Sequence, residues 1–206
     1  MENKYELNQK RKEIFWGELS PCGDLIKMYE DDDAFLDSLA SFASEGIHTT
    51  EATIIIATSS HLRGLETRLF LNGINPDAAR ESGLYIPLDA KETLARFMVY
   101  GLPDETSFRQ LLISLIERAK SNRIRALGEM VALLWGQGFK SATVKLQEFW
   151  SSFGRNEAFN LFCEYPQYGF TKDIRNSISD ISRKHSEIIA DWKKREYEAV
   201  HPSSVA

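Results

Sequence analysis

Apolar residues follow two different periods along the chain. In some segments they run without interruption, and in others they recur every three or four positions. The clearest run is 53–58, which is rich in isoleucine and threonine, and a stretch that is apolar on both faces is typical of a buried strand in a parallel sheet. Leu62, Leu65 and Leu69 follow it with the spacing of an amphipathic helix. The pattern therefore predicts strands that alternate with helices.

The same two periods give the bounds of each expected element. Strands are predicted over residues 25–29, 53–58, 84–88, 123–127 and 158–163. Helices are predicted over about 31–46, 59–73, 75–81, 90–99, 104–120, 130–135 and 142–153, and from 171 to about 197. Pro87 cannot donate to a strand ladder, so the third strand is predicted to lie at a sheet edge or to end there.

Strands that alternate with long helices predict parallel β–α–β units, whose right-handed crossovers place helices on both faces of one sheet. We therefore expect an α/β protein: a three-layer α/β/α sandwich with a mainly parallel central sheet of about five strands, and a C-terminal helix. The predicted organisation is an N-terminal extension over 1–21, a domain over 22–170, a C-terminal helix over 171–198 and a disordered tail over 199–206.

Composition narrows the class of protein. Of the 206 residues, 43% are hydrophobic, which excludes wholesale disorder. The formal net charge of −5 argues against direct binding of nucleic acid. No apolar run approaches the roughly 20 residues needed to cross a bilayer, and the N-terminus lacks the apolar core of a signal peptide. We expect a cytoplasmic protein that contacts no membrane, with Cys22 and Cys163 as reduced thiols.

Motifs for phosphate and metal chemistry are missing from the sequence. The turn after the best strand, Thr58 to His61, has neither the glycines nor the lysine of an ATP-binding loop. Gly136 and Gly138 lack a third glycine at the spacing of a dinucleotide fingerprint. The histidines at 48, 61, 185 and 201 have no metal-ligand spacing. We therefore expect no ATP hydrolysis, no metal site and no cofactor.

Candidate ligand-binding residues are the polar and aromatic residues that follow the predicted strands, because ligands of open α/β sheets bind at the carboxyl ends of the strands. They are Tyr29, Glu30, Thr58, Ser59, His61, Asp89, Glu129 and Tyr165. The set contains no strong nucleophile paired with a base, which favours a binding pocket over a catalytic site.

Structural roles compete with ligand binding for several of these residues. Aspartates 31–33 suit the N-terminus of a helix, and His61 could be a surface residue of the next helix. Glu129 is either a hydrogen-bond anchor or a pocket residue, because a buried carboxylate needs a partner. Tyr29 and Tyr165 could be aromatic residues at the rim of the core.

Five segments in the same order resemble a known family. They are 26–32 followed by Phe35 and Leu36; 53–58 followed by His61, Leu65 and Glu66; 88–98; 125–135, which contains Gly128, Glu129 and Met130; and 162–166, which contains Tyr165 and Pro166. Together they resemble the MEDS domain, a sensory domain named for methanogens, methylotrophs and DcmR, over about residues 22–170.

The resemblance implies a fold related to the KaiC and RecA-type ATPases with a degraded phosphate loop. It also implies a sensory domain that binds small organic ligands, such as hydrocarbon derivatives, and signals to an output module. Two departures from the family pattern are expected to matter. Asp24 stands where members often carry histidine, and no DNA-binding or kinase module is expected in the 22 residues before the match or in the region after it.

The predicted C-terminal helix carries a seam of apolar residues at alternating spacings of four and three. The seam comprises Ile174, Ile178, Ile181, His185, Ile188 and Trp192. It could dock on its own domain, form a homodimer, or contact a histidine kinase or transcription regulator. The predicted function is a non-enzymatic sensory module that binds a small organic ligand and signals through protein contacts. The alternatives are a KaiC-like nucleotide-binding protein without hydrolysis and an enzyme acting on organic substrates.

Overall fold

The computed structural model describes residues 25–29, 31–119, 121, 123–154, 159–166 and 187–190, and its strands at 25–28, 159–166 and 187–190 are described through their backbone. In chain order the elements are β1 (Leu25–Tyr29), α1 (Asp32–His48), β2 (Ala52–Ala57), α2 (Ser59–Leu71), α3 (Pro76–Glu81), β3 (Tyr85–Asp89), α4 (Ala90–Ala95), β4 (Met98–Val99), β5 (Leu102–Pro103), α5 (Glu105–Arg118), β6 (Ile124–Gly128), α6 (Met130–Gly136), α7 (Lys140–Gly154), β7 (Phe159–Pro166) and β8 (Glu187–Ala190).

The main sheet has six strands in the order β3-β2-β6-β7-β1-β8, and every pairing between them is parallel. The prediction of an α/β fold around a mainly parallel sheet is confirmed, although the described sheet has six strands rather than about five. All five predicted strands are present, displaced by a few residues at most. The edge position predicted from Pro87 is also confirmed, because β3 is the outermost strand on its side.

The prediction of one continuous helix over 171–198 is wrong, because β8 lies inside that segment and pairs in parallel with β1. Two consecutive β-branched residues, Ile188 and Ile189, favour an extended backbone there. The strand also gives hydrogen-bond partners to the outer edge of β1, a long-range gain that the local helical spacing does not register. The remainder of the predicted helix, most of its seam, the N-terminal extension and the C-terminal tail lie outside the described residues.

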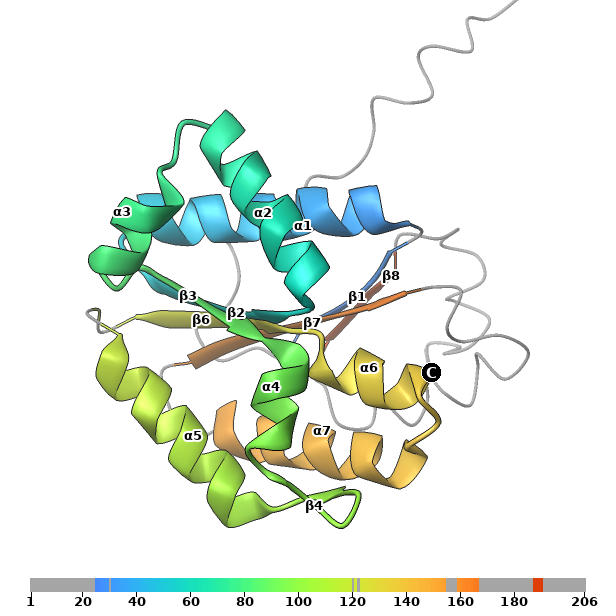
Figure 1. The fold of residues 1–206 in the computed structure, drawn as a ribbon. Coiled ribbons are helices and arrows are strands. Elements are labelled where there is room, and N and C mark those ends of the chain that lie inside the picture. Colours follow the sequence, from blue (N-terminus) through green and yellow to red (C-terminus); the bar gives the residue numbers. More distant parts are fainter. Residues whose placement is uncertain are drawn as a thin grey trace, which may run out of the picture.

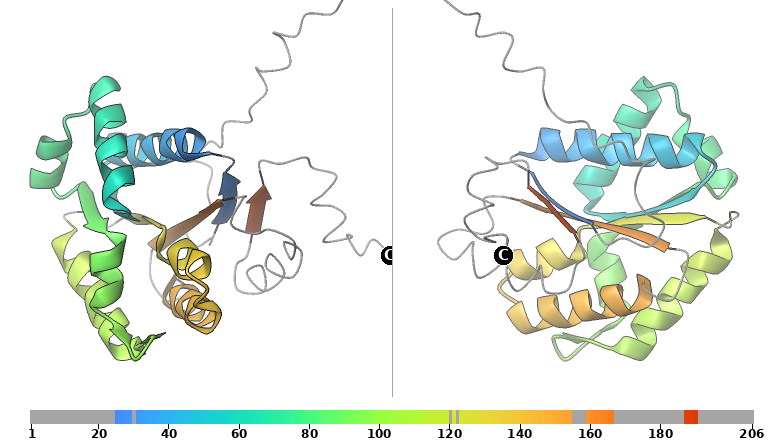
Figure 2. Two further views of the ribbon diagram at one scale, coloured as in Figure 1. Left: turned by 45° about the vertical axis from the view of Figure 1, so that its right-hand side comes forward. Right: turned by 180° about the vertical axis from the view of Figure 1, so that it is seen from behind.

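Helices cover both faces of the sheet. α1, α2 and α3 lie over one face, and α4 to α7 lie over the other (Figures 1 and 2). Ile55 of β2 packs into the first layer with Phe35 and Leu39, whereas Ile54 and Ile56 pack into the second layer. Both faces of β2 are therefore buried, which explains why its sequence is apolar without alternation.

Two neighbouring strands send their following helices to opposite faces. β2 and β6 pair in parallel, with Ile56 beside Gly128 at their carboxyl ends. The chain leaves β2 into α2 on one face and leaves β6 into α6 on the other (Figure 1). Such a divergence opens a crevice outside the strand ends, where open α/β sheets bind their ligands.

Candidate functional site

Glu129 links the two strands at this crevice. Its backbone N–H donates to the carbonyl oxygen of Ile56 in β2 at 2.8 Å, which continues the ladder one residue past β6. Its side chain is 4% exposed and lies against the turn that follows β2. There Oε2 accepts from the backbone N–H of Thr58 at 2.7 Å, and Oε1 lies 2.8 Å from Nδ1 of His61. Glu129 is therefore a hydrogen-bond anchor with both carboxylate oxygens engaged.

His61 is held in place on several sides. Thr58 caps α2, because its hydroxyl accepts from the backbone N–H of His61 at 3.4 Å. The imidazole packs edge-on against Phe35, with ring centroids 4.8 Å apart, and Phe35 in turn stacks on Tyr29 at 4.6 Å. The side chain of His61 is only 13% exposed, so it is not a surface residue.

The carboxylates around His61 decide its protonation. Burial lowers the pKa of the imidazole, but the hydrogen bond and negative charge of Glu129, reinforced by Asp32, outweigh it and raise the pKa above its ordinary value. A carboxylate can only accept, so Nδ1 is the donor to Glu129. That leaves Nε2 on the side of Asp32, whose Oδ1 lies 3.9 Å away, beyond direct hydrogen-bond distance.

A cleft of about 390 Å³ lies beside this pair. It is lined by Tyr29, Asp32, Thr58, Ser60, His61, Glu129, Ala132, Leu133, Gly136 and Gln137. Its residues from α1, α2 and the turn before α2 are polar, whereas α6 contributes a mainly apolar wall. The structure thus brings four of the eight predicted site residues together: Tyr29, Thr58, His61 and Glu129.

The sequence profile of the family described as MEDS, the MEthanogen/methylotroph, DcmR Sensory domain, matches residues 26–186. The chain belongs to the MEDS family. The match includes every residue that lines the cleft, and it begins close to the predicted start of the domain. No curated protein matches the chain.

Two further predicted residues of the MEDS domain form a separate pair. The hydroxyl of Ser59 donates to Oδ2 of Asp89 at 2.5 Å, and Oδ1 of Asp89 caps α4 by accepting from the backbone N–H groups of Lys91 and Glu92 at 2.9 and 3.0 Å. The Ser59 hydroxyl and then the backbone N–H of Glu92 lower the pKa of this carboxyl. Neither Ser59 nor Asp89 lines the cleft. Their contacts join the ends of β2 and β3.

The last two predicted site residues, and the aspartate run, have different outcomes. Glu30 lies outside the described residues, as does the side chain of Tyr165. Asp31 caps α1 by accepting from the N–H of Ala34 at 2.8 Å, so the helix-terminus interpretation is confirmed for it. Asp33 pairs with Arg68, and Asp32 faces the cleft.

Four lining residues were missed by the sequence reasoning: Ala132, Leu133 and Gly136 of α6, and Gln137, which follows its end. They lie three, four, seven and eight positions after Glu129. Because an α-helix repeats every 3.6 residues, these spacings place the four residues on the same side of the helix as Glu129. Once Glu129 is taken as a pocket residue, the helical period therefore predicts this wall.

Two backbone N–H groups at the N-terminus of α2 already have partners within the protein. In nucleotide-binding α/β proteins, backbone N–H groups at such a helix start receive the phosphate. In this MEDS domain the Thr58 N–H donates to the Glu129 carboxylate, and the His61 N–H donates to the Thr58 hydroxyl. The Glu129 carboxylate thus accepts from one of the N–H groups at the start of α2.

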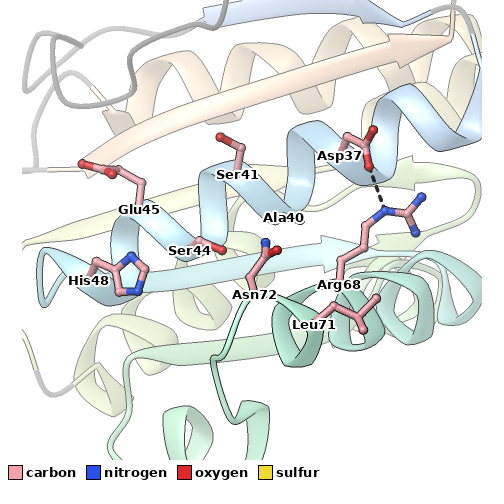
Figure 3. A pocket seen from close by; sticks show the side chains of 9 residues that line it. All are labelled: Asp37, Ala40, Ser41, Ser44, Glu45, His48, Arg68, Leu71 and Asn72. Carbon is pink, nitrogen blue, oxygen red and sulfur yellow. Dashed lines mark hydrogen bonds and ion pairs between the residues drawn. The ribbon is translucent and has the colours of Figure 1, made fainter.

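A larger hollow of about 480 Å³ lies between α1 and α2, away from the strand ends (Figure 3). Arg68 of α2 lies along it and donates to Asp37 and Asp33 of α1, each at 2.9 Å. None of the predicted site residues lines this hollow.

Within the described ranges, no group of three or more His, Cys, Asp and Glu side chains is arranged to hold a metal. None of the helices in that part of the chain has the length and apolar character of a membrane span.

Proposed function

We propose that this MEDS domain is a non-enzymatic sensory module that binds a small organic molecule in the cleft beside Glu129 and passes the signal to a partner protein. The family is one of sensory domains, which supports the sensory part of the proposal. The observation that carries the ligand-binding part is the Glu129 bridge to Thr58 and His61 at the wall of a cleft at the sheet's switch point. The volume of about 390 Å³ is in the range of small-molecule pockets.

The same bridge offers a route for the signal. Glu129 lies between β6 and α6, and its two side-chain partners lie at the start of α2, a helix on the opposite face of the sheet. A ligand that competes for His61 or Asp32 changes the forces between α2 and α6. The ligand can shift the equilibrium between two arrangements of α2 and α6 only by the difference in its affinity for them. A partner that contacts α2 or α1 would read it, and a histidine kinase or a transcription regulator is the kind of partner proposed.

The arrangement favours binding over catalysis. Glu129 orients His61 as it would orient a general base, but the group beside Nε2 is the Asp32 carboxylate rather than a hydroxyl or thiol. The hydroxyls of Thr58 and Ser60 hydrogen-bond each other at 3.1 Å. An enzyme would need a nucleophile or substrate proton within reach of Nε2.

A KaiC-like nucleotide-binding protein is the second candidate, since the cleft lies at the switch point of a parallel sheet, where such folds bind nucleotides. The occupied N–H groups at the start of α2 argue against it. A KaiC and RecA-type ancestry for the fold stays a prediction of the family resemblance. Both candidates place the ligand at the same crevice, so ligand identity decides between them.

The test is native mass spectrometry of the full chain against a metabolite panel that includes ATP and other nucleotides. Gly136→Leu is the informative variant, because Gly136 lines the cleft and a Cβ there meets no atom within 4 Å, so we expect the larger side chain to narrow the cleft. Gln110→Leu, on the exposed surface of α5, is the matched control. We expect an organic ligand that Gly136→Leu loses and Gln110→Leu keeps. A ligand retained equally by both variants would contradict the cleft, and a nucleotide lost only by Gly136→Leu would establish the second candidate.

A further inference from the structure

The lining of the cleft carries negative charge and no permanent positive charge. Its carboxylates are Asp32 and Glu129, and none of its ten residues is lysine or arginine. When His61 is protonated it neutralises Glu129, its partner at 2.8 Å, and Asp32 remains. When His61 is neutral, both carboxylates remain. The net charge of the lining is therefore negative in either state.

Two of the backbone donors beside the cleft are already used. The backbone N–H of Thr58 is taken by Glu129, and that of His61 by the Thr58 hydroxyl. Arg68, an arginine of α2, is held by Asp33 and Asp37 at the other hollow. A carboxylate or phosphate ligand that took the Thr58 N–H would have to displace an internal carboxylate that is 4% exposed, and any anion in the cleft would face Asp32.

The contact of Asp32 is longer than those of the aspartates on either side of it, so its carboxylate can accept from a ligand. Asp31 caps α1 and Asp33 pairs with Arg68, whereas Asp32 faces His61 Nε2 at 3.9 Å with its side chain 68% exposed. That separation is too long for a direct hydrogen bond. A donor group with two or more N–H bonds can sit beside both atoms, donating to Asp32 and, when the imidazole is neutral, to Nε2.

The opposite wall suits a short hydrocarbon. Ala132, Leu133 and Gly136 of α6 line it, and Gly136 leaves open space where other residues carry a side chain. A ligand with a charged head at Asp32 and an aliphatic tail along α6 would match both ends of the cleft. A small pocket that pairs an apolar wall with a few polar groups orients its ligand in this way.

We infer that the cleft takes a small organic cation, a protonated amine with a short aliphatic chain, whose ammonium group binds between Asp32 and His61 and whose chain lies along α6. The inference rests on the proposed function, because it names the chemical class of ligand for the same cleft. Binding an ammonium group is a different role for Asp32 from stabilising the N-terminus of α1, which would require only a negative charge near that end of the helix.

The experiment titrates the full chain with n-butylammonium, n-butanol and butyrate at about pH 8, where more of His61 is neutral and Nε2 can accept, and follows binding by the imidazole NMR signals. The His61 signals are assigned by their absence in His61→Gln. Butylammonium is expected to shift the His61 signals saturably, and butyrate to leave them unchanged. Asp32→Asn should weaken butylammonium binding about tenfold or more, since it removes a charge-assisted hydrogen bond. Asp33→Asn, one residue away and paired with Arg68, is the matched control and should bind as the wild-type chain does.

The outcomes separate this inference from the proposed function. Butanol or butyrate binding as well as butylammonium, with Gly136→Leu abolishing it, would overturn the ammonium assignment and leave a ligand-binding cleft. Equal weakening by Asp32→Asn and Asp33→Asn would reduce the effect to general electrostatics and also overturn it. The absence of saturable butylammonium binding would overturn it too, and the metabolite panel would then decide the proposed function alone.

Discussion

Replacing Glu129 tests the bridge on which both the fold of the crevice and the proposed signal depend. Glu129→Ala removes the acceptors of the Thr58 N–H and the His61 Nδ1–H, which are bound at 2.7 and 2.8 Å. Hydrogen bonds to a charged group contribute about 1.5–3 kcal/mol each, and water can partly replace the lost partners through the adjacent cleft. We therefore expect a loss of about 3 kcal/mol in the free energy of unfolding, or about 6–12 °C in Tm for a chain of this size.

Glu129→Gln separates charge from hydrogen bonding in the same experiment. The amide keeps the shape of the side chain and can still accept from Thr58, so it should lose less stability than Glu129→Ala. It removes the charge that holds the pKa of His61 up. Because that pKa is raised on folding, the stabilisation is fully present below the ordinary value of 6.5 and is lost as the pH rises through the folded-state pKa.

Urea denaturation of the wild-type chain and both variants at about pH 6 and about pH 8 measures these effects. The advantage of the wild-type chain over Glu129→Gln should be larger at the lower pH. Glu105→Gln, which breaks an exposed pair with Arg109 on α5, is the matched control and should change little at either pH. Equal unfolding free energies for the wild-type chain and Glu129→Ala would refute the reasoning, as would an advantage over Glu129→Gln that grows with pH.

Three further substitutions test the frame around the site, each by thermal denaturation. Gly46→Ala should lower the free energy of unfolding by about 1–3 kcal/mol, because the added Cβ would lie 2.1 Å from Oγ1 of Thr53. Gly128→Ala is the control and should be far milder, because a Cβ there meets no atom within 4 Å. Similar losses for the two variants would contradict this packing. Tyr100→Asn should stabilise the β4–β5 hairpin by up to about 1 kcal/mol, since this exposed residue has φ +49°, and a loss of stability would show that the ring is needed. Asp89→Ala should cost about 1 kcal/mol at neutral pH, and the difference should shrink as the pH falls through the lowered pKa of the carboxyl; a pH-independent difference would contradict its role as an ionised cap.

The strands and the layers of the fold could be predicted because their signals are local. The run 53–58 is apolar on both faces because Ile54, Ile55 and Ile56 alternate between two helical layers, and covered strands need no polar side. β8 could not be predicted in the same way. Its segment has helical spacing, and the pairing with β1 that decides its structure connects residues about 160 positions apart along the chain.

The sequence predicted at which edge of the sheet the site lies, but not which of its side chains contact one another. The rule that ligands bind at the carboxyl ends of strands brought His61 and Glu129 into one candidate set. The sequence does not say that β2 lies beside β6, and this neighbour relation alone brings the two side chains, 68 residues apart, within 2.8 Å. Asp89 entered the same set from the next strand, and the sheet order directs it toward Ser59 and α4 instead.

Backbone amide NMR of the full chain, titrated with the ligand that native mass spectrometry retains, would show whether that ligand binds in the cleft beside Glu129. We expect the largest chemical-shift changes at Thr58, His61 and Glu129 and along α6, and we expect them to vanish in Gly136→Leu. Changes concentrated at Asp37, Ser41 and Arg68, in the hollow between α1 and α2, would place the ligand elsewhere and contradict the assignment of the cleft.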